Sequence, residues 1–86
     1  MKLRQINNNC HELVTGKGTV LFSYETPVAV SFDLPIGDKW GTYKTAGHST
    51  TTTRHINKWT ATQRTVLQET LYAYAAEILR AAWFIT

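Results

Sequence analysis

The chain is poor in cysteine and proline and has no long uninterrupted apolar run. Its 86 residues include one cysteine, Cys10, so no disulfide can form within the chain. A lone cysteine is typical of a reducing cytoplasm, and we interpret Cys10 as a small structural residue. His11 follows it directly, but neighbours in an extended strand point to opposite faces, which makes the two residues a poor catalytic pair.

No segment has the composition of a leader or a membrane anchor. Residues 5–12 are polar where a signal peptide requires an apolar stretch. The apolar C-terminal segment is interrupted by Gln68, Glu69, Glu77 and Arg80, which argues against a membrane-spanning helix. We therefore expect a cytoplasmic protein that has no membrane partner.

The motifs of common enzymes are also missing. The chain has no Gly-rich phosphate loop followed by Lys and Ser or Thr, no Gly-x-Ser-x-Gly and no paired histidine ligands on a helix. His48 and His55 lie far in sequence from Cys10 and from the nearest carboxylates, without zinc-type spacing. The sequence therefore predicts a protein that is not an enzyme and has no catalytic residue, metal, cofactor or small-molecule substrate.

The first half of the chain has the pattern of an antiparallel sheet within one small domain, residues 1–86. Residues 2–45 predict four or five strands, and Gly16-Lys17-Gly18 lies between two β-prone runs, which indicates a hairpin. Residues 28, 30, 32 and 34 are apolar and alternate with smaller or polar ones, so they are predicted to share one buried face. Trp40 is predicted to lie in the core.

The second half has the pattern of two helices, residues 50–59 and 61–84. Ser49 or Thr50 can cap the first, which is expected to bury Ile56 and Trp59. A run of strands followed by helices predicts an α+β fold in which both helices pack on one face of the sheet.

The second predicted helix has two apolar stripes where a surface helix needs one. Either the helix is central, wedged between the sheet and the first helix, or the second stripe is an interface for a homodimer or another docking partner. The first stripe contains Leu67, Leu71, Tyr74, Ile78 and Ala82, and the second contains Tyr72, Ala76, Leu79 and Trp83.

The best functional signal is another absence, because no Asp or Glu occurs from residue 39 to residue 64. A segment of one charge sign attracts phosphate groups or acidic partners. It can equally be a solvated face, and no helix-turn-helix, zinc-finger or RNA-recognition signature accompanies it. The candidate surface for nucleic acid or an acidic partner consists of Lys39, Lys44, Arg54, Lys58 and Arg64.

Two sequence blocks resemble a family of small uncharacterised proteins from bacteriophages and bacterial mobile elements. They are Ser-Tyr-Glu-Thr-Pro-Val-Ala at residues 23–29 and Arg-His-Ile-Asn-Lys-Trp at residues 54–59, and the resemblance covers residues 1–60. It implies a phage-type accessory protein that acts in the cytoplasm of a bacterial host. The apolar helix after Thr60 departs from the pattern of that family, which makes it a candidate site for a specific partner.

Three functions remain open from the sequence. The first is a non-enzymatic accessory protein that binds nucleic acid or a host nucleoprotein through the basic segment. The second is a protein–protein inhibitor of a host defence or other host machine, comparable to an anti-CRISPR protein. The third is a structural or assembly component of a phage particle.

Overall fold

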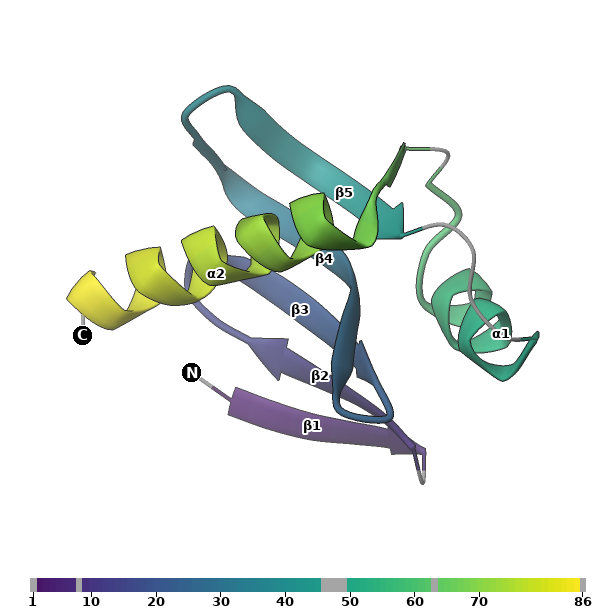
Figure 1. The fold of residues 1–86 in the computed structure, drawn as a ribbon. Helices are drawn as coiled ribbons and strands as arrows, with labels where there is room; N and C mark the ends of the chain where they lie inside the picture. The colour runs from purple at the N-terminus through teal and green to yellow at the C-terminus, as the bar shows by residue number, and fades with distance from the viewer. Residues whose placement is uncertain (1, 8, 46–49, 63, 86) are drawn as a thin grey trace.

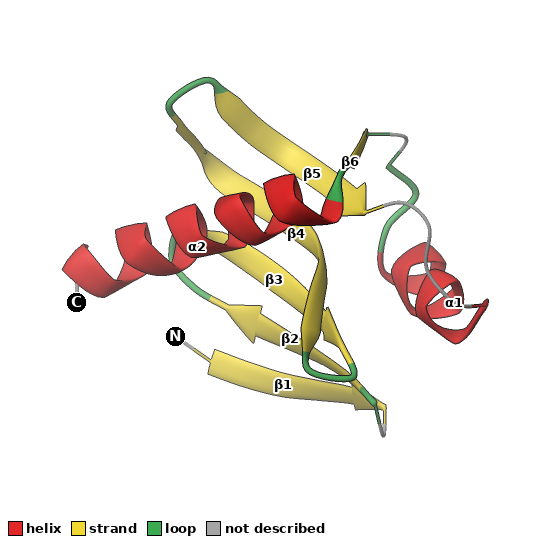
Figure 2. Cartoon of the chain, viewed as in Figure 1, coloured by secondary structure: helices red, strands yellow, loops and turns green. Residues whose placement is uncertain are grey.

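The computed structural model describes residues 2–7, 9–45, 50–62 and 64–85 and has the predicted α+β architecture (Figure 1). The described elements are β1 (Lys2–Asn7), β2 (Cys10–Val14), β3 (Gly18–Ser23), β4 (Thr26–Ile36), β5 (Lys39–Thr45), α1 (Thr50–Trp59), β6 (Thr65–Val66) and α2 (Gln68–Ile85). One sheet has a long helix, α2, across one of its faces, and a shorter helix, α1, lies near one end of its strands (Figure 2).

The six strands lie in the sheet in chain order, from β1 to β6. Neighbours from β1 to β5 are antiparallel, and the predicted hairpin between β2 and β3 is confirmed. In its turn, the Thr15 hydroxyl donates to the Gly18 carbonyl oxygen and accepts a hydrogen bond from the Gly18 amide. Adjacent strands joined by short turns need only local pairing, which is why the pattern of residues 2–45 located them correctly.

The sixth strand, β6, was not predicted. Thr65 and Val66 pair in parallel with Lys44 and Thr45, inside the range predicted as helix 61–84. The backbone amide of Lys44 also donates to the Arg64 carbonyl oxygen over 2.9 Å. The chain therefore crosses back to the sheet edge before α2 begins at Gln68, and the predicted helix start was too early.

The two helices pack on opposite faces of the sheet, so the prediction that they share one face is wrong. Val20 packs in a cluster with Leu71 and Ile78 of α2, whereas its neighbour Leu21 packs with Ile56 of α1. Successive residues of a strand point to opposite faces, and both Val20 and Leu21 have no exposed surface. We call the two sides of the sheet the α1 face and the α2 face.

A register shift in β4 changes which of its apolar residues share a face. The β3–β4 pairing slips between Leu21 and Phe22. As a result Val28 joins the cluster under α1, while Val30 and Phe32 join the cluster under α2. The predicted common face of residues 28, 30, 32 and 34 is therefore wrong at its first position, because an extra residue in one strand interrupts the alternation. Its last position is not buried either, since Leu34 is 50% exposed.

The helical patterns are confirmed in part. In α1, Ile56 is buried and Trp59 half-buried, as predicted, while the proposed cap residue Ser49 lies outside the described residues. In α2, Leu71 and Ile78 are fully buried, but Leu67 is 72% exposed because it precedes the helix. The first stripe of α2 thus becomes its sheet-facing side from Leu71 to Ile78.

Candidate functional site

The basic residues predicted to form one surface are divided between the faces of the sheet. Lys39 at the start of β5 lies beside α2, where its Nζ is 3.0 Å from Glu77 Oε2 and 3.8 Å from Asp38 Oδ1. The hydrogen bond with the Glu77 carboxylate raises the pKa of Lys39. This cation is therefore engaged within the chain and is separated from the cations on the α1 face.

Arg64 is also engaged within the chain, where it closes over two aromatic rings of β5. Its guanidinium donates to the Trp40 carbonyl oxygen over 2.7 Å and to the Tyr43 hydroxyl over 2.8 Å. The guanidinium carbon lies 4.2 Å from the Tyr43 ring centroid and 5.3 Å from that of Trp40. Trp40 is 62% exposed, so its predicted place in the core is wrong: the ring lies against a cation instead of the apolar interior.

The other three predicted cations lie on the α1 side. Arg54 and Lys58 are exposed on α1, and Lys44 lies opposite Ala29, which packs in the cluster under that helix. Strand β1 adds further charge, because Arg4 lies opposite Glu12 on the face that α1 covers. The resulting set, here the basic face, consists of Lys2, Arg4, Lys44, Arg54 and Lys58.

A serine and a histidine meet between β3 and α1. Ser23 Oγ lies 2.8 Å from His55 Nδ1 and 3.2 Å from Thr52 Oγ1. A nucleophile paired with a base would show such a contact, but Ser23 is only 2% exposed and Thr52 is also buried. A substrate cannot reach this hydroxyl, and the contacts serve to hold α1 against the sheet.

Cys10 and Glu12 lie beneath α1 as well. Burial, and then the charge of Glu12, raise the pKa of the Cys10 thiol, which disfavours the reactive thiolate. Trp59 Nε1 donates to Glu12 Oε2 over 2.8 Å, and Arg4 Nη1 lies 3.4 Å from Glu12 Oε1. Both oxygens of this carboxylate are occupied, so Glu12 fastens α1 and β1 to β2.

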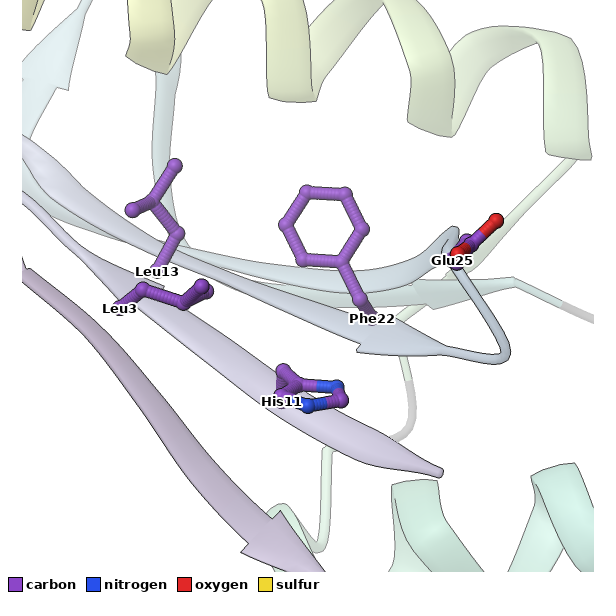
Figure 3. A pocket seen from close by; sticks show the side chains of 5 residues that line it. All are labelled: Leu3, His11, Leu13, Phe22 and Glu25. Atoms are coloured by element: carbon purple, nitrogen blue, oxygen red, sulfur yellow. The ribbon is translucent and has the colours of Figure 1, made fainter. Parts of the chain in front are cut away.

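The α2 face is only partly covered, and its uncovered part forms an open hollow of about 440 Å³ (Figure 3). Helix α2 packs across β3, β4 and β5 and leaves β1 and β2 open (Figure 1). Leu13 and Phe22 point toward the side on which α2 lies, and Leu3 beside them is 65% exposed. The hollow is lined by Leu3, His11, Leu13, Phe22 and Glu25.

The contacts of α2 with β5 show how the helix is turned. The Tyr74 ring centroid lies 5.0 Å from that of Tyr43, and Glu77 pairs with Lys39, so this flank of the helix faces β5. At 100° per residue, Tyr72 and Leu79 lie on the opposite flank of the helix. That flank is therefore turned toward the side of the sheet where β1, β2 and the hollow lie.

The residues on this flank are those of the second predicted stripe. Tyr72 is 48% exposed, Ala76 is exposed and Leu79 is half-buried, while the side chain of Trp83 lies outside what the structure describes. The stripe is thus not buried between the sheet and α1. It lies on the flank of α2 that is turned toward β1–β3. The hollow itself is lined by residues of the strands and the β3–β4 turn. We group its apolar residues with the stripe as the apolar face, which consists of Leu3, Leu13, Phe22, Tyr72, Ala76 and Leu79.

The described part of the chain contains neither a metal-binding cluster nor a membrane-spanning helix. Within residues 2–7, 9–45, 50–62 and 64–85, no group of three or more His, Cys, Asp or Glu side chains is arranged to hold a metal ion. In the same ranges, no helix has both the length and the apolar character needed to cross a membrane.

A family model described as a family of unknown function, DUF8033, matches residues 1–76. The chain belongs to this family. No curated protein and no solved structure matches the chain. The DUF8033 match runs past residue 60 into α2, so the helix as far as Ala76 belongs to the family pattern, whereas Leu79 lies beyond the match.

Sequence reasoning identified the α2 part of the apolar face and missed the sheet part. Leu3, Leu13 and Phe22 lie within the residues that DUF8033 matches. Their alternation with polar neighbours predicts a buried side and carries no sign that α2 leaves this side open. A second unforeseen feature is the backbone conformation of the β3–β4 turn, where Tyr24 and Glu25 have positive φ angles of 53° and 73°. Tyr24 is 53% exposed there.

Proposed function

We propose that the protein is a non-enzymatic binding protein that docks on another protein through its apolar face. The observation that carries the proposal is the open hollow of about 440 Å³ at β1–β3, together with the exposed Tyr72 on the flank of α2 that is turned toward these strands. Contiguous exposed apolar surface of this kind marks interaction sites in soluble proteins. The inaccessible Ser23 hydroxyl and the raised pKa of Cys10 support a role without catalysis.

The energetics favour docking on a protein rather than on a small charged molecule. Burying a side chain such as Leu3 contributes about 1.5–3 kcal/mol, and Tyr72 combines a large ring with a hydroxyl that can bond at a wet rim. His11 and Glu25 are polar groups at the hollow itself, able to set the orientation of a partner. An apolar anchor with a few polar groups around it is the usual anatomy of a protein interface.

The biological setting that we propose follows from the resemblance to phage and mobile-element proteins. Under this proposal the protein is an accessory factor in the cytoplasm of a bacterial host, and its partner belongs to a host machine that it inhibits. The support is the pair of sequence blocks at residues 23–29 and 54–59 together with a free docking surface. A place in a phage particle is the alternative setting for the same face.

Site-specific photocrosslinking tests the docking face. A photoreactive p-benzoylphenylalanine at Tyr72 is expected to give a covalent adduct of discrete mass in cells that express the protein. The same residue at Tyr24 gives none, although both tyrosines are about half exposed, at 48% and 53%. In the Tyr72 background, Leu3→Glu is expected to lower the adduct yield about tenfold, because it places a charge in an apolar contact.

The matched control for that substitution is Leu34→Glu. Leu34 is 50% exposed on β4 and does not line the hollow, so the adduct yield is expected to stay unchanged. An adduct of twice the chain mass identifies the partner as a second copy. Adduct formation at Tyr24 but not at Tyr72 would contradict docking through the apolar face.

Nucleic-acid binding is a second candidate function, favoured by the basic face. Arg54 and Lys58 are exposed one turn apart on α1, and Arg4 lies on the same side of the sheet. The exposed ring of Tyr24 lies 6.2 Å from that of His55 at the end of this face, in a position to stack on a base. Phosphate contacts from the three cations with stacking at the turn would suit a single strand.

Fluorescence anisotropy with labelled single-stranded DNA and RNA tests this candidate. Three phosphate contacts on a single strand predict a loss of about 20-fold in affinity between roughly 50 and 200 mM salt. The double substitution of Arg54 and Lys58 by alanine should weaken binding further, whereas Arg80→Ala on α2 should not. Equal affinity at both salt concentrations, or equal losses in both variants, would be incompatible with a phosphate-binding α1 side.

A further inference from the structure

We propose that the open edge of β1 accepts an extended segment of the partner protein as a seventh strand, and that this segment alternates acidic and apolar side chains. The inference rests on the proposed function, since the apolar face forms one side of the site. It adds the conformation of the partner segment and its charge.

Strand β1 is the edge of the sheet best suited to strand addition. Among the described strands it has a neighbour on one side only, and its residues 2–5 pair with β2 in unbroken antiparallel register. The opposite edge is β6, which has only two residues. A six-residue edge strand offers a row of backbone groups to another chain, and very short edges do not.

On the α2 face, the edge carries an apolar side chain beside a hollow. Leu3 is 65% exposed, lies opposite Leu13 and lines the hollow. Side chains directly opposite one another on paired strands lie about 4.5–5.5 Å apart. An apolar residue of the partner segment opposite Leu3 would therefore bury the exposed surface of Leu3 and close the open side of the hollow. For this reason we expect apolar residues on this side of the partner segment.

On the α1 face, the same edge is cationic. Lys2 and Arg4 point to this side, and the Arg4 side chain is 61% exposed although it contacts Glu12. A small second hollow of about 70 Å³ lies farther along this face, and its lining includes Ile6 and Lys58. Because Glu12 is already shared by Trp59 and Arg4, the net charge here is positive, and acidic side chains are the complementary ones.

The same charges disfavour a second copy of the chain as the added strand. If two copies paired their β1 strands antiparallel about a two-fold axis, the α1 faces of both copies would lie on the same side of the joined sheet. This pairing would place Arg4 against Arg4, or Lys2 against Arg4, of the other copy. Like charges directly opposite each other are destabilising in a sheet. A partner strand of opposite charge has no such conflict, and this decides between the two occupants.

Binding of short designed peptides tests the proposal. The probe is a fluorescein-labelled, capped peptide, Glu-Val-Glu-Leu-Glu-Val-Glu, followed by anisotropy with the full chain. Two further peptides are N-methylated, one at the Glu nitrogens and one at the Val and Leu nitrogens. Because only one edge of an added strand bonds β1, one methylated peptide is expected to lose about tenfold or more in affinity while the other binds as the parent does.

Variants of the protein test the charge requirement. Arg4→Glu is expected to weaken the parent peptide about tenfold by turning an attractive cross-strand pair into a repulsive one. The matched control is Arg80→Glu, an exposed arginine on α2, which should leave the affinity unchanged. Hydrogen exchange provides the structural readout, since the amides of residues 2–7 should become protected when the peptide is bound.

The outcomes separate this inference from the proposed function. Equal binding of both methylated peptides, or binding without protection of residues 2–7, overturns strand addition. So does a failure of the parent peptide to bind while position 72 still crosslinks to a partner, and in that case docking through the apolar face stands. Loss of both peptide binding and the position-72 adduct refutes the two together. DNA that displaces the peptide from wild type but not from Arg4→Glu would assign this edge to nucleic acid instead.

Discussion

Replacing Leu71 with alanine is expected to lower the free energy of unfolding by about 2–5 kcal/mol, whereas Leu67→Ala should change it by less than about 0.5 kcal/mol. Leu71 is fully buried between α2 and the sheet, and Leu67, one turn earlier, is 72% exposed. Removing the buried side chain loses its transfer free energy and leaves a cavity against Val20 and Val30. A small domain has about 5–15 kcal/mol of stability, so the first change removes a large share of it.

Urea denaturation followed by circular dichroism measures this difference. The two substitutions delete the same atoms from the same predicted stripe, so their effect on the unfolded chain is matched. An equal loss of stability in both variants would contradict the start of α2 at Gln68. If Leu71→Ala proves too unstable to purify, Ile78→Val offers a smaller deletion in the same cluster, with an expected cost of about 0.5–1.5 kcal/mol.

The second large effect is expected at Gly18, where alanine should cost about 1–3 kcal/mol of stability. A Cβ atom there would collide with the Ser31 carbonyl oxygen and lie 3.2 Å from Ile78 Cδ1 and 3.3 Å from Phe32 Cα. The oxygen belongs to the paired strand β4, so it cannot move away without disturbing the β3–β4 ladder. The methyl group therefore has to strain the sheet just where α2 packs on it.

Gly16→Ala provides the control, since no atom lies within 4 Å of a Cβ built at that position. Both glycines belong to the same turn segment, and the control variant should unfold within about 0.5 kcal/mol of wild type. Thermal unfolding followed by circular dichroism compares the two. A Gly18→Ala protein as stable as the control would mean that β3 and β4 are farther apart than the structure places them.

The opposite placement of the helices makes the two candidate surfaces separable by mutation. The basic face lies with α1 and the apolar face with α2, and the edge strand β1 contributes to both. Substitutions at Arg54 or Lys58 should therefore leave the crosslink at position 72 unchanged. A change at Arg4 is the exception, because β1 contributes side chains to both surfaces.

The local elements follow from the sequence because their causes are local. The turn at residues 15–18 depends on two glycines and a threonine hydroxyl that bonds its own loop. In α1, four-residue spacing alone places Ile56 inward and Arg54 outward, as predicted. The α+β class likewise needs only the order of strands and helices along the chain. The added strand β6 escaped prediction because two residues are too few to show a period.

The candidate site depended on contacts between distant segments. The second stripe of α2 was visible from its spacing, but its meaning depends on which strands the helix leaves uncovered. Likewise, the basic run is continuous in sequence and not in space. Lys39 forms an ion pair with Glu77, and Arg64 contacts the aromatic rings of β5. Arg54 and Lys58 are instead exposed on α1.

By itself, then, the sequence determined the succession of strands and helices along the chain, the amphipathic side of each helix and the sign of the charge between residues 39 and 64. Only the tertiary structure decided which helix covers which face. Strand β3 buries Val20 on one side and Leu21 on the other, so either face could have accepted either apolar stripe. The sheet leaves one part of its surface without a helix because α2 crosses β3–β5 and α1 packs on the opposite side. Such an uncovered part of the sheet is a property of the packed chain, and no local sequence pattern predicts it.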